Sequence, residues 1–120
     1  MKIAVTSQGP DLNSQVDPRF GRAKHFIVVD TETEGFSAHD NTQNLNAAQG
    51  AGIQAGRTVA DLGVEAVVTG NVGPKAFATL QAANIKIFLT TSGTVKEALA
   101  QFKAGELKDT SKANVDGHWM

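Results

Sequence analysis

The chain has 120 residues, which suffice for one domain with a single hydrophobic core. Its formal net charge of −1 argues against a general nucleic-acid or membrane-surface binder, because such proteins carry a basic bias. Cysteine is absent, which excludes disulfides, thiolate nucleophiles and every cysteine-based zinc or iron–sulfur motif. No apolar run approaches the roughly 18 residues that span a bilayer. The first residues resemble a strand rather than a signal peptide, so we expect a cytoplasmic protein.

The first third of the chain predicts three short strands, at residues 3–6, 26–30 and 36–39, which together form a β-meander. A loop over residues 7–22 separates the first two strands and is rich in Gly, Pro, Asn and Asp. It is much longer than the usual loop of about 4–6 residues. A loop of this length is typically functional, or else it is ordered by pairing.

A helix is predicted over residues 47–62, with Asn46 as its N-cap and Gly63 at its end. Each glycine inside a helix costs about 0.5–1 kcal/mol relative to alanine. This helix contains three, so we expect its backbone to approach a neighbour closely, either the sheet or a ligand. The three glycines are Gly50, Gly52 and Gly56.

The remaining chain predicts strands at residues 66–69 and 85–90, separated by a helix that starts at Pro74. Thr94 and Glu97 form a capping box for a last helix. The apolar residues of that helix keep the i, i+3, i+4, i+7 spacing; they are Val95, Ala98, Leu99 and Phe102.

The predicted order of elements is β-β-β-α-β-α-β-α. The two βαβ crossovers require parallel neighbours and the meander adds antiparallel ones, so the fold class is α/β with a mixed five-stranded sheet and helices on its faces. Residues 1–107 form the predicted domain and residues 108–120 a polar C-terminal tail. Trp119 in this tail either folds over a site or stays free of the domain.

Three segments follow the carboxyl ends of the predicted parallel strands, where open α/β sheets bind ligands. Two of them, residues 70–75 and 91–94, lead into helix N-termini, whose free N–H groups and dipole favour an anion. The third leads into VDPRFGRAKHF at residues 16–26, which concentrates cations and which we expect to act as a mobile clamp. Asp17 before Pro18 predicts an Asx-type turn. The candidate binding residues are Ser7, Arg19, Phe20, Arg22, Lys24, Gly70, Asn71, Lys75, Ser92 and Gly93.

The sequence supports catalysis poorly, and we expect neither catalytic residues nor protein metal ligands. The segment from Gly70 to Lys75 is shorter than a P-loop, and Ala76 occupies the position of the Mg²⁺-binding hydroxyl. The first strand lacks the carboxylates of a two-metal nuclease. The histidines lie in separate segments without a metal-binding spacing; they are His25, His39 and His118. An enzyme acting on a phosphorylated small molecule stays possible, although no general base is apparent.

Three segments resemble the dinitrogenase iron–molybdenum cofactor biosynthesis family over about residues 2–107. They are KIAVTS, VDPRFGRAKHFIVVD and the run from GAGIQAGRTVADLG to ALAQFKAGEL. The resemblance implies a ribonuclease-H-like fold without nuclease activity and non-covalent binding of a metal–sulfur cluster. In the nitrogenase branch this is iron–molybdenum cofactor or its precursor. In a branch of small single-domain proteins from anaerobic sulfate reducers it is a molybdenum–copper sulfide, and the short chain favours that branch.

The resemblance also explains why cations can replace cysteines. A sulfido-metalate cluster brings its own sulfide and negative charge, so arginine forks, lysine and helix N-termini can hold it, with Phe20 covering its apolar side. Some relatives carry a histidine where this chain has Gln49, and Asn71 occupies another useful ligand position. We therefore do not expect histidine coordination, for which His25 and His39 are the nearby candidates.

Besides the enzyme named above, two functions stay open at this point. One is a non-catalytic carrier or assembly protein for the cluster. The other is an interaction module whose rim recognises a protein partner, and the family implies P-loop ATPases as partners. We expect a monomer that binds neither nucleic acid nor membrane.

Overall fold

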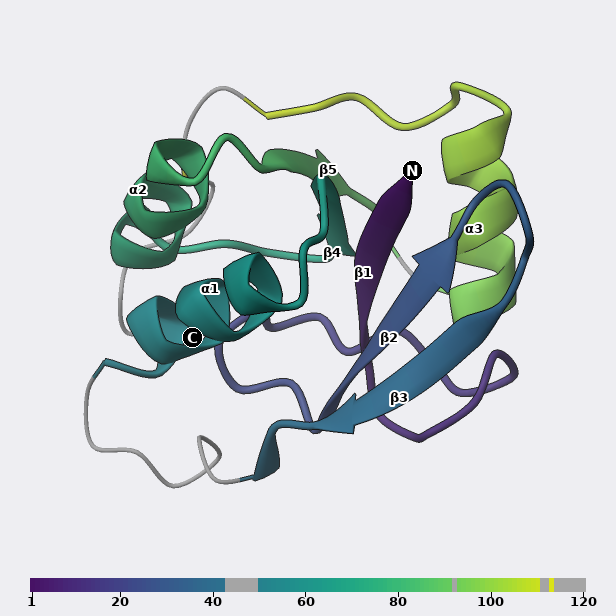
Figure 1. The fold of residues 1–120 in the computed structure, drawn as a ribbon, viewed down its shortest axis with the longest axis horizontal. Coiled ribbons are helices and arrows are strands. Elements are labelled where there is room, and N and C mark those ends of the chain that lie inside the picture. Colours follow the sequence, from purple (N-terminus) through teal and green to yellow (C-terminus); the bar gives the residue numbers. More distant parts are fainter. Residues whose placement is uncertain (43–49, 92, 111–112, 114–120) are drawn as a thin grey trace.

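The computed structural model describes residues 1–42, 50–91, 93–110 and 113. Its five strands form one mixed sheet in the order β3-β2-β1-β4-β5 (Figure 1). β1, β2 and β3 pair antiparallel, whereas β4 and β5 run parallel to β1. The mixed five-stranded sheet of an α/β protein is therefore confirmed. The strands are β1 (Lys2–Ser7), β2 (His25–Asp30), β3 (Phe36–Asp40), β4 (Ala66–Thr69) and β5 (Lys86–Leu89).

Three helices cover the sheet, α1 (Ala51–Asp61), α2 (Pro74–Ala82) and α3 (Val95–Lys103). Figure 1 shows α1 and α2 on one face and α3 on the other. Alternation along the central strand explains both cores: Ala4 packs with α1 and α2, while Ile3 and Val5 pack with α3. Within the described ranges, no helix combines the length and apolar character that crossing a membrane requires.

The ends of α2 and α3 follow the local signals in the sequence. Pro74 occupies the first turn of α2, where its missing N–H costs nothing. The capping box of α3 is confirmed: Glu97 N donates to Thr94 Oγ1 at 3.1 Å, and Thr94 N donates to Glu97 Oε1 at 2.9 Å. The predicted apolar stripe of α3 packs on the sheet as expected.

The start of α1 differs from the prediction. Gly50 has φ 82°, outside the helical region, and the helix begins at Ala51. A continuous helix from residue 47 is therefore wrong, because a left-handed residue interrupts it. The predicted N-cap Asn46 lies outside the described residues. The predicted end is correct, since Gly63 adopts φ 77° just beyond the helix.

The expected close approach of the α1 backbone occurs, but its partners are a helix and a loop. A Cβ on Gly56 would lie 2.7 Å from Cγ2 of Thr79 in α2. A Cβ on Gly21, in the long loop, would lie 2.8 Å from the backbone N of Gly52. Gly56 of α1 therefore permits close helix–helix packing, and Gly21 of the loop permits the close approach of the loop to α1.

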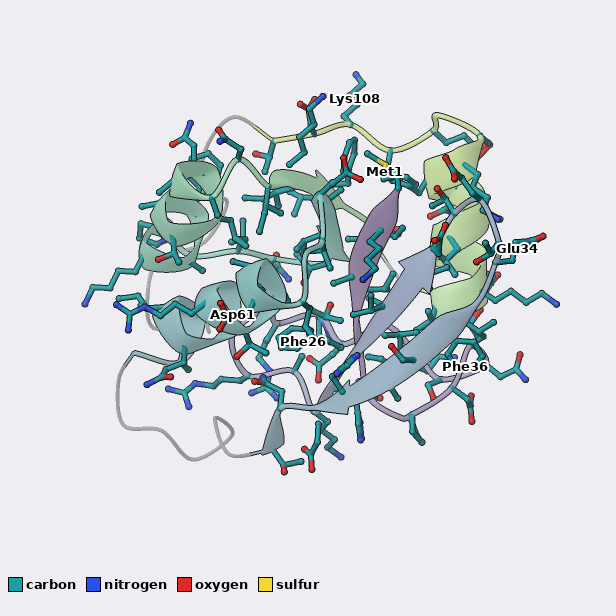
Figure 2. The ribbon with its side chains drawn as sticks, viewed as in Figure 1. Met1, Phe26, Glu34, Phe36, Asp61 and Lys108 are labelled. Atoms are coloured by element: carbon teal, nitrogen blue, oxygen red, sulfur yellow. The ribbon has the colours of Figure 1, made fainter. Side chains whose placement is uncertain are left out.

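The two outer strands of the sheet differ in how far they are covered. Residues 108–110 lie along the outer edge of β5: Thr110 N donates to Ile87 O at 2.8 Å, and Asp109 forms a bridge with Phe88. The start of the predicted tail therefore lies along the sheet, and Trp119 lies outside the described residues. At the other edge, β3 is exposed, with Phe36 on its surface and Phe26 of β2 in the interior (Figure 2).

Candidate ligand-binding site

The long loop between β1 and β2 crosses the carboxyl end of the parallel strands. Asp17 N donates to Thr6 O at 2.9 Å, so the loop returns alongside β1. Val16 N donates to Gly93 O at 2.9 Å, and Phe20 N donates to Asn71 O at 3.3 Å. The loop thus joins the segments that precede α2 and α3. The three segments at this edge of the sheet lie together, as the sequence predicts.

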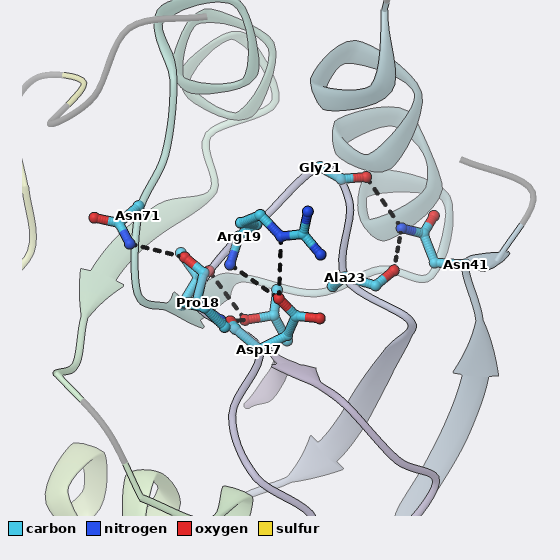
Figure 3. A network of polar contacts seen from close by, with 9 residues as sticks. Asp17, Pro18, Arg19, Gly21, Ala23, Asn41 and Asn71 are labelled. Atoms are coloured by element: carbon cyan, nitrogen blue, oxygen red, sulfur yellow. Dashed lines mark hydrogen bonds and ion pairs between the residues drawn. The ribbon is translucent and has the colours of Figure 1, made fainter. Parts of the chain in front are cut away.

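The Asp17–Pro18 turn is held by several hydrogen bonds (Figure 3). Arg19 N donates to Asp17 Oδ1 at 3.1 Å, which confirms the Asx-type turn. Asn71 Nδ2 donates to Pro18 O at 2.9 Å. A Cβ on Gly70 would lie 2.8 Å from Pro18 Cα, so the absence of a side chain there lets the loop lie on the end of β4.

Two buried threonines, near the ends of β1 and β4, stabilise this turn. Thr6 Oγ1 lies 2.7 Å from Asp17 O and 2.9 Å from Thr69 Oγ1. Its single hydroxyl hydrogen cannot serve both, so Thr6 donates to the Asp17 carbonyl and accepts from Thr69. Thr6 therefore holds Asp17 at both its N–H and its carbonyl.

Phe20 corrects the sequence-based expectation. Its side chain is completely buried in the core beneath α1 and α2, with its ring centroid 5.7 Å from that of Phe26. An aromatic ring in that position anchors the loop and offers no surface to a ligand. Hydrogen bonds and this buried ring both fix the loop to the rest of the domain. It is therefore an anchored loop, in place of the expected mobile clamp.

The cations of the loop differ in exposure. The Arg19 side chain is 41% exposed, and its Nε lies 3.8 Å from Asp17 Oδ1. Arg22 is half-buried, while Lys24 and Lys75 are exposed. Lys75 belongs to the first turn of α2. Four predicted cations thus belong to the loop or to the helix start at this edge, and two of them are arginines.

Asn41, which sequence reasoning missed, fixes the backbone around Arg22. This buried residue follows β3, and its Nδ2 donates to Gly21 O at 3.2 Å and Ala23 O at 2.8 Å. Asn41 N donates to Lys24 O at 2.8 Å. Asparagine after a strand signals only a turn, and nothing local indicates that its amide reaches a loop about twenty residues earlier.

The other predicted site residues have mainly structural contacts. Ser7 is buried, and its Oγ donates to Gly9 O at 2.7 Å, which stabilises the start of the loop. Gly93 adopts φ 112°, a conformation that favours glycine, and its carbonyl accepts from Val16. Ser92 lies outside the described residues.

His25 and His39 lie on the sheet beside the loop, and His118 lies outside the described residues. His25 is paired across the sheet with both Ser7 and Asp40. Hydrogen bonds from Thr42, and then the charge of His25, lower the pKa of Asp40 below its ordinary value. His39 Nε2 lies 2.9 Å from Ser37 Oγ. In the part of the chain that the structure describes, no group of three or more His, Cys, Asp or Glu side chains could hold a metal ion.

Comparisons with known proteins match the chain to a family and to several similar proteins. The sequence matches the family described as dinitrogenase iron–molybdenum cofactor over residues 1–105. It is 28% identical over 110 residues to an uncharacterized protein of Methanocaldococcus jannaschii, covering 90% of each chain.

Solved structures of other proteins are also similar to the chain. The apo form of the orange protein from Desulfovibrio gigas is 43% identical, with a TM-score of 0.92 and coverage of 95% of this chain and 96% of that one. A Thermotoga protein provisionally assigned as NifB is 37% identical, with a TM-score of 0.85 and coverage of 97% and 98%.

Proposed function

Because the chain belongs to the dinitrogenase iron–molybdenum cofactor family, we propose that it is a non-catalytic protein that binds and carries, or helps to assemble, an anionic metal–sulfur cluster. The observation that carries this proposal is the position of Arg19 and Arg22. Both belong to an anchored loop at the carboxyl end of the parallel strands, the edge where α/β sheets bind ligands. Lys24 and Lys75 add positive charge to the same loop and to the start of α2.

The chemistry of the chain suits a cluster that arrives with its own sulfide. Cysteine is absent, so the protein offers no thiolate to ligate iron, molybdenum or copper. Guanidinium groups supply fixed planar donors and a permanent positive charge, and they are less strongly hydrated than ammonium groups. Such donors hold a sulfur-rich anion from outside without replacing its metal ligands. Because Phe20 is buried, the loop contributes charge and hydrogen-bond donors to this contact rather than an aromatic surface.

We assign the cargo to the molybdenum–copper sulfide type. The 43% identity to the orange protein over nearly the full length of both chains supports this assignment. A carrier of iron–molybdenum cofactor or its precursor is the alternative within the family, and P-loop ATPases are the partners we propose for either. The sheet order β3-β2-β1-β4-β5, with β2 antiparallel to β1, supports a ribonuclease-H-like class for the fold.

Reconstitution tests the cargo directly. The purified protein is incubated with tetrathiomolybdate and a copper salt, desalted and examined by visible absorption and metal analysis. We expect a coloured eluate that retains molybdenum and copper in a constant ratio to protein. A colourless eluate without molybdenum would contradict the assignment of a molybdenum–copper cargo. Retention of isolated iron–molybdenum cofactor in a parallel sample would then favour the alternative.

A further inference from the structure

A buried negative charge lies beside one of the two arginines proposed to hold the cargo. The Asp17 side chain is 3% exposed, whereas that of Arg19 is 41% exposed. Asp17 Oδ1 lies 3.8 Å from Arg19 Nε, on one edge of the guanidinium fork (Figure 3). An anion that uses this edge of Arg19 must therefore compete with a carboxylate that the protein itself supplies.

The charge of Asp17 is not needed for the turn that this residue forms. An Asx-type turn requires only an acceptor oxygen on the side chain, which asparagine also provides. Asp11, in the same loop, makes the same kind of turn, since its Oδ1 accepts from Asn13 N at 2.9 Å. Asp11 is exposed, and in the part of the chain that the structure describes its carboxylate pairs with no cation. The Asx-type turn therefore does not account for the negative charge beside Arg19.

We propose that Asp17 is a built-in competitor of the cargo, which pairs with Arg19 in the empty protein and weakens the hold of Arg19 on a bound anion. This inference rests on the proposed function. A protein that carries a cluster must also release it, and a competing carboxylate makes binding reversible without a change of fold. Because the carboxylate is buried, solvent screens its effect on Arg19 less than it would screen a surface charge.

The proposal predicts that Asp17→Asn strengthens anion binding, an effect that a purely structural role of Asp17 does not produce. Asp17→Asn keeps the acceptor for Arg19 N and removes the charge. If Asp17 only shaped the loop, the substitution would leave anion binding unchanged or weaken it. If Asp17 competes, the substitution strengthens binding, by about twofold to fivefold if the pair has the strength of a partly exposed ion pair.

The experiment measures the dissociation constant of tetrathiomolybdate for the full chain by equilibrium dialysis at low ionic strength. Asp11→Asn is the matched control, because it makes the same chemical change in the same loop and alters the net charge equally. We expect tighter binding for Asp17→Asn and wild-type binding for Asp11→Asn. The gain must disappear in the Arg19→Ala background, because Asp17 acts through Arg19.

Each outcome decides whether Asp17 competes with the anion or only shapes the loop. Equal or weaker binding by Asp17→Asn at an unchanged melting temperature overturns the proposal, as does a gain that persists without Arg19. Should Asp17→Asn fold poorly, Asp17→Ser, which retains a hydroxyl acceptor, serves the same comparison. Wild-type protein that binds no tetrathiomolybdate contradicts the molybdenum–copper function and this inference together, whereas wild-type binding with no effect of Asp17→Asn overturns this inference alone.

Discussion

Phe20→Ala is expected to lower the free energy of unfolding by about 3–5 kcal/mol, the usual cost of deleting a buried aromatic ring. The side chain is completely buried between the loop and the core beneath α1 and α2, where it also contacts Phe26. The cavity left behind is bordered by helices and strands that cannot collapse into it fully. Chemical denaturation followed by circular dichroism measures the change.

Phe36→Ala is the matched control, because it makes the same chemical change on the outer strand β3. Phe36 is 46% exposed, so we expect a loss in the free energy of unfolding below about 1 kcal/mol. If Phe20→Ala costs no more than this control, the ring does not anchor the loop. The sequence-based expectation that Phe20 faces the ligand would then regain support.

Gly21→Ala is expected to destabilise the protein by about 1–3 kcal/mol through overpacking. The new Cβ would lie 2.8 Å from Gly52 N and 2.9 Å from Gly52 Cα. These are backbone atoms in the first turn of α1, which cannot move aside as a side-chain tip can. Relief of the clash requires a shift of the loop, and Gly21 lies between the two arginines in sequence. We therefore expect weaker anion binding as well as a lower melting temperature.

Gly35→Ala provides the comparison for this substitution. The nearest atom to a new Cβ there is Thr33 Oγ1 at 3.4 Å, an ordinary contact with a side chain. We expect a change within about 0.5 kcal/mol and unaltered anion binding. Equal behaviour of the two alanine variants would show that the loop does not lie against α1 as closely as described.

Most of the secondary structure could be predicted because its causes are local. The buried run Ala66–Thr69, which is mostly β-branched, forms β4 with its predicted bounds. Pro74 and the Thr94–Glu97 pair each determine a helix start through contacts within one turn. The predicted start of α1 was wrong because Gly50 adopts a left-handed conformation. Glycine can adopt either left- or right-handed φ values, so the local sequence does not show which one it takes.

The edge of the sheet that carries the candidate site could also be predicted, because parallel strands place the segments after them side by side. The contacts within the site could not. Phe20 follows Arg19 in a polar loop, and only the tertiary fold places its ring in the core. Asn41 reaches Gly21 and Ala23 across a separation of 20 and 18 residues, and Gly21 meets Gly52 only when α1 has docked. Such pairings depend on how the chain closes in space, which no local pattern encodes.

The central claim is that Arg19 and Arg22 hold an anionic cluster, and the double variant Arg19→Ala/Arg22→Ala tests it most directly. Its control is Lys86→Ala/Lys108→Ala, which removes the same charge from exposed lysines at the start of β5 and beyond α3, away from the loop. Binding of the reconstituted molybdenum–copper sulfide is measured by titration at one ionic strength for both variants and wild type. We expect the arginine variant to bind at least about tenfold more weakly, because two charge-assisted contacts are lost. The lysine variant should match wild type. Undiminished binding by the arginine variant, or an equal loss in both variants, would contradict the account.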